Sequence, residues 1–328
     1  MELSPKEFRQ QFEEGLFEIH WRQWSALGVA SHAEPEETRL IDLEALVVST
    51  LTLGLRDLRL LHASLEWLLN HGAWLNLPRL KRIARIFMKP PIALSPHTGP
   101  LLEPAVFDLL GKTLHQFGRK VWTVREPDDP ESHKTVPPEY AAIFNNFHPR
   151  GIVTGPVMQR PPLLQLKLRG VFGVDARVEA FIYLLSHESG NSNAIAKEIF
   201  YNQRNIYQIL ETWHTAGVLT KVKGPKVGTL TLERKNEWLN TLGLTVMPVY
   251  VNWVNCFGLF NQILQAVSLP PWAEDAYMLS SFFRDILPEA QRLGRHLDTS
   301  VPEPDQYPGA RYVPPFASKM LEVIGRLK

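Results

Sequence analysis

The side chains with the most evident binding chemistry lie together between residues 202 and 208, in the sequence NQRNIYQ. An arginine can bind guanine through two hydrogen bonds, and asparagine or glutamine can bind adenine in the same way. A second group follows between Gly217 and Lys235, where five Lys or Arg residues stand against one acid, Glu233, although the formal net charge of the chain is only +1. These residue types indicate binding by hydrogen bonds and by charge.

Patterns for catalysis are absent from the sequence. The eleven histidines are scattered, and there is no HExxH, no Cys/His cluster at zinc spacing and no G-x-S-x-G. Gly111-Lys112-Thr113 matches the end of a Walker A loop, but the glycine required five residues earlier is Val106, so we expect helix there. The sequence therefore predicts no enzyme, no cofactor and no metal site. An enzyme whose site is assembled from distant residues in the helical regions is the remaining alternative.

Two predicted helices precede the polar group. Asp175 is suited to cap the first helix, whose apolar residues recur at the spacing of one helical face: Val178, Phe181, Ile182 and Leu185. Gly190 and Asn191 supply a turn, and Ser192 is suited to cap a second, short helix that carries Ile195, Ala196 and Ile199 on one side. This second helix must end tightly at Phe200 and Tyr201.

A third helix and a hairpin carry the two polar groups themselves. Asn202 is suited to cap the third helix, and Gly217 follows its end. Its apolar residues are Ile206, Ile209, Leu210 and Trp213, which turns Arg204, Gln208, Glu211 and Thr215 outward. Residues 218–223 and 229–232 then alternate around a turn at 224–228, which predicts a two-stranded hairpin with a basic tip.

This order of helix, short helix, helix and basic hairpin resembles the winged helix-turn-helix transcriptional regulators of the MarR and ArsR type. The resemblance is carried by AIAKEI, by NQRNIYQILETWHTAGVL and by the glycine-flanked wing. It implies that the third helix lies in the major groove of double-stranded DNA with its N-terminal residues on base edges. Carried over by position, the implied base contacts are Asn202, Gln203, Arg204, Asn205, Tyr207 and Gln208. The wing lysines Lys221, Lys223 and Lys226 would lie near phosphates, where cations displace counterions.

The alternative is a winged-helix scaffold or complex subunit that binds a protein and does not read DNA. An apolar exposed surface on the third helix and wing would indicate it, and Tyr207 is the only aromatic residue there. Glu211 counts against DNA, because a carboxylate is repelled by phosphates unless it accepts from a cytosine amino group. The basic residues between Gly217 and Lys235 favour DNA. We therefore predict a sequence-specific DNA-binding transcriptional regulator.

Residues 1–125 predict an N-terminal helical domain. Apolar helices are expected at about 42–53 and 56–70, separated by Gly54. The stretch from Leu75 to Lys89 holds no acid and five basic residues, namely Arg79, Lys81, Arg82, Arg85 and Lys89. This stretch is either the third helix of a second, degenerate helix-turn-helix or the solvated side of a core helix.

A proline-rich linker or arm is predicted over 126–165, because eight of the 26 prolines fall between Glu126 and Pro162. Its central sequence YAAIFNNF is apolar enough to dock on a domain surface. The winged helix-turn-helix domain is then assigned to 166–243. The sequence LLQLKLRGVFG at its start predicts an extra strand or a short lead-in helix.

Residues 244–328 predict a C-terminal helical region. No charged residue occurs between Trp238 and Ala273, but Pro248 and five amide side chains between Val246 and Leu269 argue against a membrane span. We expect a buried helix at about 251–267, either in the core of one subunit or at the contact of a homodimer. A bent helix over 272–297 and a final amphipathic helix with Phe316, Met320, Leu321 and Ile324 follow.

The composition sets the remaining bounds. The 328 residues are 45% hydrophobic and 21% charged, which is ordinary for globular proteins. The single cysteine, Cys256, excludes an intramolecular disulfide, and the first fifteen residues contain no apolar segment of a secretory signal. We therefore expect a mainly α, multi-domain cytoplasmic protein with a central winged helix-turn-helix, local DNA binding and a homodimeric state. An effector or a protein partner of the helical flanks is left open.

Overall fold

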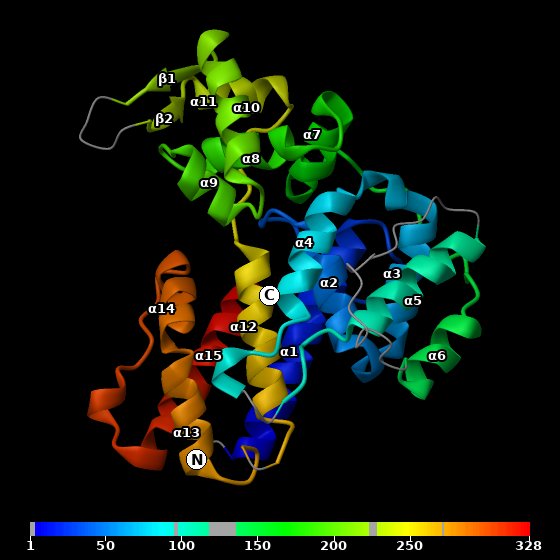
Figure 1. Cartoon of the computed structure of the whole chain (residues 1–328), viewed down its shortest axis with the longest axis vertical. Coiled ribbons are helices and arrows are strands. Elements are labelled where there is room, and N and C mark those ends of the chain that lie inside the picture. Colours follow the sequence, from blue (N-terminus) through cyan, green and yellow to red (C-terminus); the bar gives the residue numbers. More distant parts are fainter. Residues whose placement is uncertain (1–3, 95–97, 118–135, 223–227, 271) are drawn as a thin grey trace.

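The structure is a computed structural model that describes residues 4–94, 98–117, 136–222, 228–270 and 272–328. These residues form fifteen α-helices and one small antiparallel sheet of two strands, so the predicted mainly α fold is confirmed. Two hydrophobic cores divide them into a large helical body and a smaller group that lies at one end of it (Figure 1). We call the smaller group the hairpin unit.

The body contains ten α-helices from both ends of the sequence. The first six are α1 Pro5–Ala26, α2 Leu43–Leu53, α3 Leu58–His71, α4 Leu77–Phe87, α5 Pro104–Gln116 and α6 Pro138–Asn145. The last four are α12 Trp253–Ala266, α13 Ala276–Asp285, α14 Leu287–His296 and α15 Val313–Leu327. Short 3₁₀ turns connect them at Gly54–Arg56, Gly72–Trp74, Ile92–Leu94, Pro161–Leu163, Pro304–Gln306 and Gly309–Tyr312.

Capping side chains fix the starts of α1, α2, α3, α4 and α12 in the body. Ser4 and Glu7 form a capping box at α1, in which the side chain of each residue accepts from the backbone amide of the other. Asp42, Asp57, Asn76 and Asn252 accept from backbone amides at the starts of α2, α3, α4 and α12. The predicted helices near 42–53 and 56–70 are therefore α2 and α3, and the break between them lies at Gly54–Arg56.

One core joins the two flanking regions of the sequence. Residues of α1, α2, α3, α12 and α15 belong to the same hydrophobic cluster, so residues 1–125 and 244–328 do not form separate cores. Ten of the fourteen residues of α12 are buried, among them Phe257 and Phe260, and Phe260 lies edge-on to Phe12 of α1. The helix expected at 251–267 thus packs inside one chain, as the first of its two alternatives required.

The second predicted helical stretch of this region is divided. The helix expected over 272–297 is two helices, α13 and α14, which meet at Ile286 just before Pro288. The final helix α15 buries Phe316, Met320 and Ile324, with Leu321 half-buried against the core. It lies along α1 in the body (Figure 1).

The predicted arm is docked on the body. Helix α6 contains most of YAAIFNNF and buries Phe144, and Phe147 just after it is also buried. Further on, the carboxylate of Glu66 on α3 accepts hydrogen bonds from the amides of Arg150, Ile152 and Val153. Residues 126–135 of the predicted linker, like residues 118–125 before them, lie outside the described part of the chain.

The hairpin unit contains five helices and both strands. They are α7 Leu164–Phe172, α8 Ala176–Ser186, α9 Ser192–Glu198, α10 Gln203–Thr215, β1 Leu219–Lys221, β2 Leu230–Leu232 and α11 Lys235–Thr241. Leu219 pairs with Leu232 and Lys221 with Leu230 in the antiparallel register. The sequence LLQLKLRGVFG forms α7, so the helical alternative describes it.

We compared the described helices with the requirements of a membrane span. None of them combines the length and the apolar composition that crossing a bilayer requires. The uncharged stretch before Ala273 instead forms the end of α11, an extended return to the body and α12. On this return, the amide of Val249 donates to the carbonyl of Thr38 and its carbonyl accepts from Leu40.

Candidate nucleic-acid interface

Helix α10 carries the polar group on which the functional prediction depends. Ile206 and Leu210 are buried in the core of the hairpin unit, while Ile209 and Trp213 are half-buried against it. The opposite face is open, and the side chains of Arg204, Gln208 and Thr215 are exposed while Glu211 is half-exposed. The predicted inner and outer faces of this helix are confirmed.

The first two predicted contacts are partly occupied by local hydrogen bonds. The side chain of Asn202 accepts from the amide of Arg204 and caps α10. Gln203 is exposed, and its Nε2 donates to Oγ of Ser192 over 2.8 Å. The sequence predicts Ser192 as the cap of α9, and this prediction is wrong. The cap is Asn191, whose side chain accepts from the amide of Ala194. Ser192 instead ties the start of α9 to the start of α10.

The remaining predicted contacts of α10 are available for binding. Arg204, Asn205, Tyr207 and Gln208 are exposed, and the side chain of Tyr207 keeps 51% of its accessible surface. None of these four side chains has a hydrogen-bond or ion-pair partner within the described residues. Together they place one guanidinium, two amides and one phenol on a single turn and a half of helix.

Only one of the three predicted wing lysines lies in the described part of the chain. Lys221, at the end of β1, is exposed, whereas Lys223 and Lys226 lie outside the described residues. Arg234 is exposed and pairs with Glu237 over 3.4 Å. Lys235 is half-buried, and its amine donates to the carbonyl oxygen of His187, so this lysine is used inside the unit.

The turn between α9 and α10 is held by residues of the body. Phe200 adopts a positive φ of 60° and packs against the core of the body. The Nε of Arg79 on α4 donates to the carbonyl oxygen of Ile199 over 3.0 Å. Asn252, at the start of α12, donates to the carboxylate of Glu198 over 2.8 Å and also to its carbonyl oxygen. The start of α10 is therefore fixed relative to the body.

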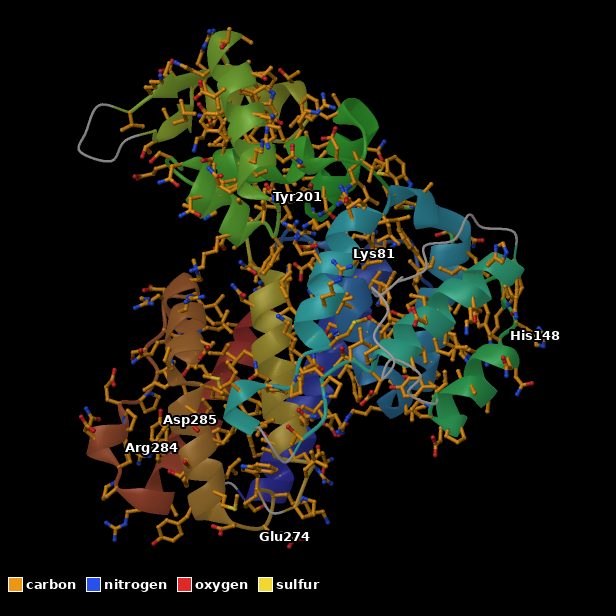
Figure 2. The ribbon with its side chains drawn as sticks, in the orientation of Figure 1. Lys81, His148, Tyr201, Glu274, Arg284 and Asp285 are labelled. Carbon is orange, nitrogen blue, oxygen red and sulfur yellow. The ribbon has the colours of Figure 1, made fainter. Side chains whose placement is uncertain are left out.

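A buried ionic network continues from this turn into the body. The Tyr201 hydroxyl, at the boundary with α4 (Figure 2), donates to Glu179 of α8 over 2.9 Å. Arg169 of α7 donates to Glu179 over 2.6 Å and binds both oxygens of Glu44 on α2, at 2.7 and 2.8 Å. Arg79 completes the network with bonds to Glu44 and to both oxygens of Asp42.

Burial and charge act in opposite directions on these groups. Burial alone would raise the pKa of Asp42, but the Arg79 guanidinium holds that pKa below its ordinary value. Burial would likewise lower the pKa of Arg79 and of Arg169, but the neighbouring carboxylates raise both. Burial raises the pKa of the Tyr201 hydroxyl well above its ordinary value, with Glu179 adding to the rise, so Tyr201 stays a donor. The Arg79–Asp42 ion pair therefore stays charged across ordinary pH.

Several of these positioning residues were not identified from the sequence. The sequence predicts Arg79 either on a second helix-turn-helix or on the solvated side of a core helix, but its side chain is only 3% exposed and belongs to the network. Arg82 and Arg85 are exposed on one face of α4, whose other face is buried, and Lys89 is exposed just after the helix. One sequence signal could have indicated the network: a single charged residue within an apolar run, as at Glu44 in α2 and Glu179 in α8. Such a charge on a core face requires a buried partner.

The described residues contain no group of three His, Cys, Asp or Glu side chains placed to hold a metal ion. Comparisons with known protein families, with curated proteins and with solved structures find no match to this chain. Any function must therefore be argued from the surfaces and contacts of the chain itself.

Proposed function

We propose that this protein is a sequence-specific DNA-binding transcriptional regulator in which α8, α9, α10, β1 and β2 act as a winged helix-turn-helix. Helix α10 would lie in the major groove of double-stranded DNA, with Arg204, Asn205, Tyr207 and Gln208 toward the base edges. Lys221 and the remaining wing lysines would lie near phosphates. The observation that carries the proposal is the unpartnered, exposed polar face at the start of α10.

The arrangement of the unit supports this reading. The three helices and both strands share one hydrophobic core, to which Val178, Ile195, Ile206, Leu219 and Leu232 belong. The turn before α9 joins the sheet, because Gly190 and Leu230 exchange two backbone hydrogen bonds of 2.9 Å. The hairpin is thus tied to the turn between α8 and α9, and this turn, the hairpin and α10 belong to one unit.

A winged-helix module that docks on a protein is the second candidate. It is favoured by two exposed side chains of the hairpin unit, Tyr207 on α10 and Val222 just after β1, the latter keeping 42% of its accessible surface. Aromatic residues are enriched at protein interfaces. The cation and amides beside Tyr207 fit base edges better than an apolar partner, so DNA remains our proposal.

Selection from a random duplex library tests the proposal directly. The purified protein is incubated with the library at two salt concentrations, and the retained duplexes are sequenced. We expect enrichment of one motif and a steep loss of affinity with salt. A palindromic motif would establish a dimer on two half-sites. Salt-sensitive binding without enrichment would contradict base reading, and absence of binding would leave the protein-docking module.

A further inference from the structure

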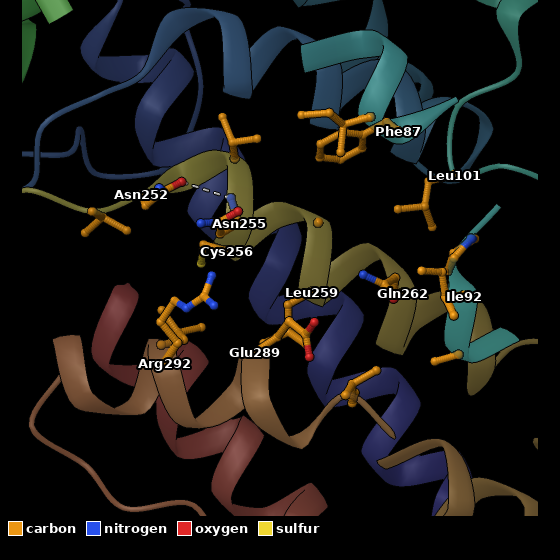
Figure 3. Close-up of a pocket in the computed structure, with 18 of the residues that line it drawn as sticks. Phe87, Ile92, Leu101, Asn252, Asn255, Cys256, Leu259, Gln262, Glu289 and Arg292 are labelled. Atoms are coloured by element: carbon orange, nitrogen blue, oxygen red, sulfur yellow. Dashed lines mark hydrogen bonds between the residues drawn. The ribbon is translucent and has the colours of Figure 1, made fainter. Parts of the chain in front are cut away.

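A groove of about 820 Å³ runs along α12, between that helix and the neighbouring α4, Ile92–Leu94 and α14 (Figure 3). Its floor is apolar, with Phe87, Leu259 and Ile286 buried beneath it. Pockets that hold small ligands typically have volumes of about 300–1,000 Å³, an apolar lining and a few convergent polar groups. The groove has the size and the floor of such a site.

Four polar side chains converge on this groove without partners. Asn255 and Gln262 come from α12, and Glu289 and Arg292 come from α14. Within the part of the chain that the structure describes, none of the four side chains forms a hydrogen bond or an ion pair. Figure 3 shows the Arg292 guanidinium directed toward Asn255 and Cys256, and the Glu289 carboxylate beside Leu259. One cation and one anion thus face the same apolar floor from neighbouring turns of α14.

We propose that the groove binds a zwitterionic small molecule with an apolar side chain, in the manner of an apolar amino acid. Its carboxylate would accept from Arg292 and the Asn255 amide, because an arginine fork matches a carboxylate. Its ammonium would donate to Glu289, and its apolar group would cover Phe87 and Leu259. A ligand with only a negative charge would leave Glu289 without a partner and repelled by the bound anion. A ligand with only a positive charge would leave Arg292 in the same position.

The other charged side chains of the groove do not change this assignment. Lys89, Asp285, Glu289, Arg292, His296 and Glu198 are the groups that line it. Glu198 already accepts from Asn252, and Lys89 and Asp285 are exposed groups of opposite charge. The groove therefore has no strong excess of one charge, which again suits a ligand that carries both.

The same groove reaches the turn that begins α10. Glu198, Tyr250 and Asn252 line it, and Asn252 both donates to Glu198 and accepts from the amide of Asn255. A ligand held by Asn255 would therefore act on the cap of α12 and, through it, on the turn before α10. This coupling rests on the proposed function, whereas the ligand site does not.

Calorimetry without DNA tests the site with three matched probes: phenylalanine, 3-phenylpropionate and phenethylamine. Phenylalanine should bind to the full chain, and each singly charged analogue should bind at least about 10-fold more weakly. Arg292→Gln should weaken phenylalanine about 10- to 100-fold but should not weaken phenethylamine, because the cationic probe loses no partner and is relieved of a like charge. Glu289→Gln should weaken phenylalanine but should not weaken 3-phenylpropionate, because the anionic probe is relieved of a like charge. Arg295→Gln, an exposed change on the same helix outside the groove, is the control and should leave all three unchanged.

A filling variant checks the location. A Cβ at Gly258 would meet Phe87 at an ordinary 3.9 Å, so Gly258→Leu should fold and fill the groove. Phenylalanine binding should then be lost. Absence of phenylalanine binding to the unaltered chain, equal binding of the analogues, or binding that survives Gly258→Leu would each overturn the proposed site.

The coupling has its own measurement. Affinity for the selected duplex should change at least about 5-fold when phenylalanine saturates the protein. Phenylalanine binding with unchanged DNA affinity would overturn the coupling and leave the site. Phenylalanine binding by a chain that binds no duplex would instead overturn the proposed function, so the two failures are distinguishable.

Discussion

Arg79 and Ile199 are joined by a hydrogen bond of 3.0 Å between the guanidinium Nε and the carbonyl oxygen, across the boundary between the body and the hairpin unit. Ile199 lies three residues before Asn202, the cap of α10. The other nitrogens of Arg79 bind Asp42 and Glu44, which begin α2. One side chain therefore connects the first turn of a body helix to the segment that sets the direction of the proposed DNA-reading helix.

Replacement of Arg79 tests how much the network stabilises the fold. Arg79→Met leaves two buried carboxylates with fewer partners, which should lower the free energy of unfolding by about 3–5 kcal/mol. Denaturant unfolding of both proteins measures this loss. Arg82→Met on the exposed side of α4 is the matched control and should change stability by less than about 0.5 kcal/mol. Equal effects of the two substitutions would show that the network adds nothing to stability.

Tyr201 provides a more conservative test of the same boundary. Tyr201→Phe removes only the hydroxyl that donates to Glu179, so a buried acceptor loses one partner and the free energy of unfolding should fall by about 1–3 kcal/mol. The matched control is Tyr207→Phe, which removes an exposed hydroxyl on the nearby helix α10 and should leave the free energy of unfolding unchanged. Thermal or denaturant unfolding measures both effects. An unchanged stability of Tyr201→Phe would contradict the role given to this hydrogen bond.

The local features of the hairpin unit could be predicted from the sequence because they depend on periodicity and capping. The faces of α8 and α10 follow from apolar residues at helical spacing, and Asn202 and Gly217 mark the ends of α10. The cap of α9 was placed one residue too late, at Ser192 instead of Asn191, because both side chains can accept the same type of hydrogen bond.

The long-range contacts could not be predicted in this way. Arg79 stands 37 residues from Asp42, and Arg169 stands 125 residues from Glu44. Periodicity shows which face of a helix is apolar but not which other helix covers it, so the shared core of α1, α12 and α15 left no local signal. The four unpartnered side chains of the groove were likewise ordinary amides and charges in the sequence.

His20 makes the stability of the body depend on pH. It is fully buried, Nδ1 lies 2.8 Å from the Leu16 carbonyl and Nε2 lies 2.9 Å from Ser49 Oγ, which suits a neutral ring. Burial lowers its pKa to about 4, although the Leu16 carbonyl and Asp57 oppose the shift. The unfolded chain therefore binds the proton more readily between about pH 6.5 and 4, and folding stability should fall as pH falls through this window.

The contribution of His20 alone to this loss of folding stability should be about 3 kcal/mol. Unfolding free energies of the wild type and of His20→Gln, measured from pH 7.5 to 4, isolate this contribution. The advantage of the wild type should be constant above pH 7 and shrink toward pH 4. Other histidines, such as His62 and His187, contribute equally to both proteins, so parallel curves would contradict the assignment to His20.

Arg204 and Lys221 separate base reading from phosphate binding on the proposed interface. Arg204→Ala should weaken binding to the selected duplex by about 1–3 kcal/mol and relax preference at one base position, because it removes a side chain able to bind guanine at two atoms. Lys221→Ala should weaken binding to selected and random duplexes alike and flatten the dependence on salt, because it removes one phosphate contact. Lys223→Ala, in the remainder of the wing, should act as Lys221→Ala does.

Titrations at several salt concentrations with both duplexes distinguish these effects. If Arg204→Ala reduced both affinities equally, α10 would contact only the DNA backbone, and the assignment of base reading to it would fail.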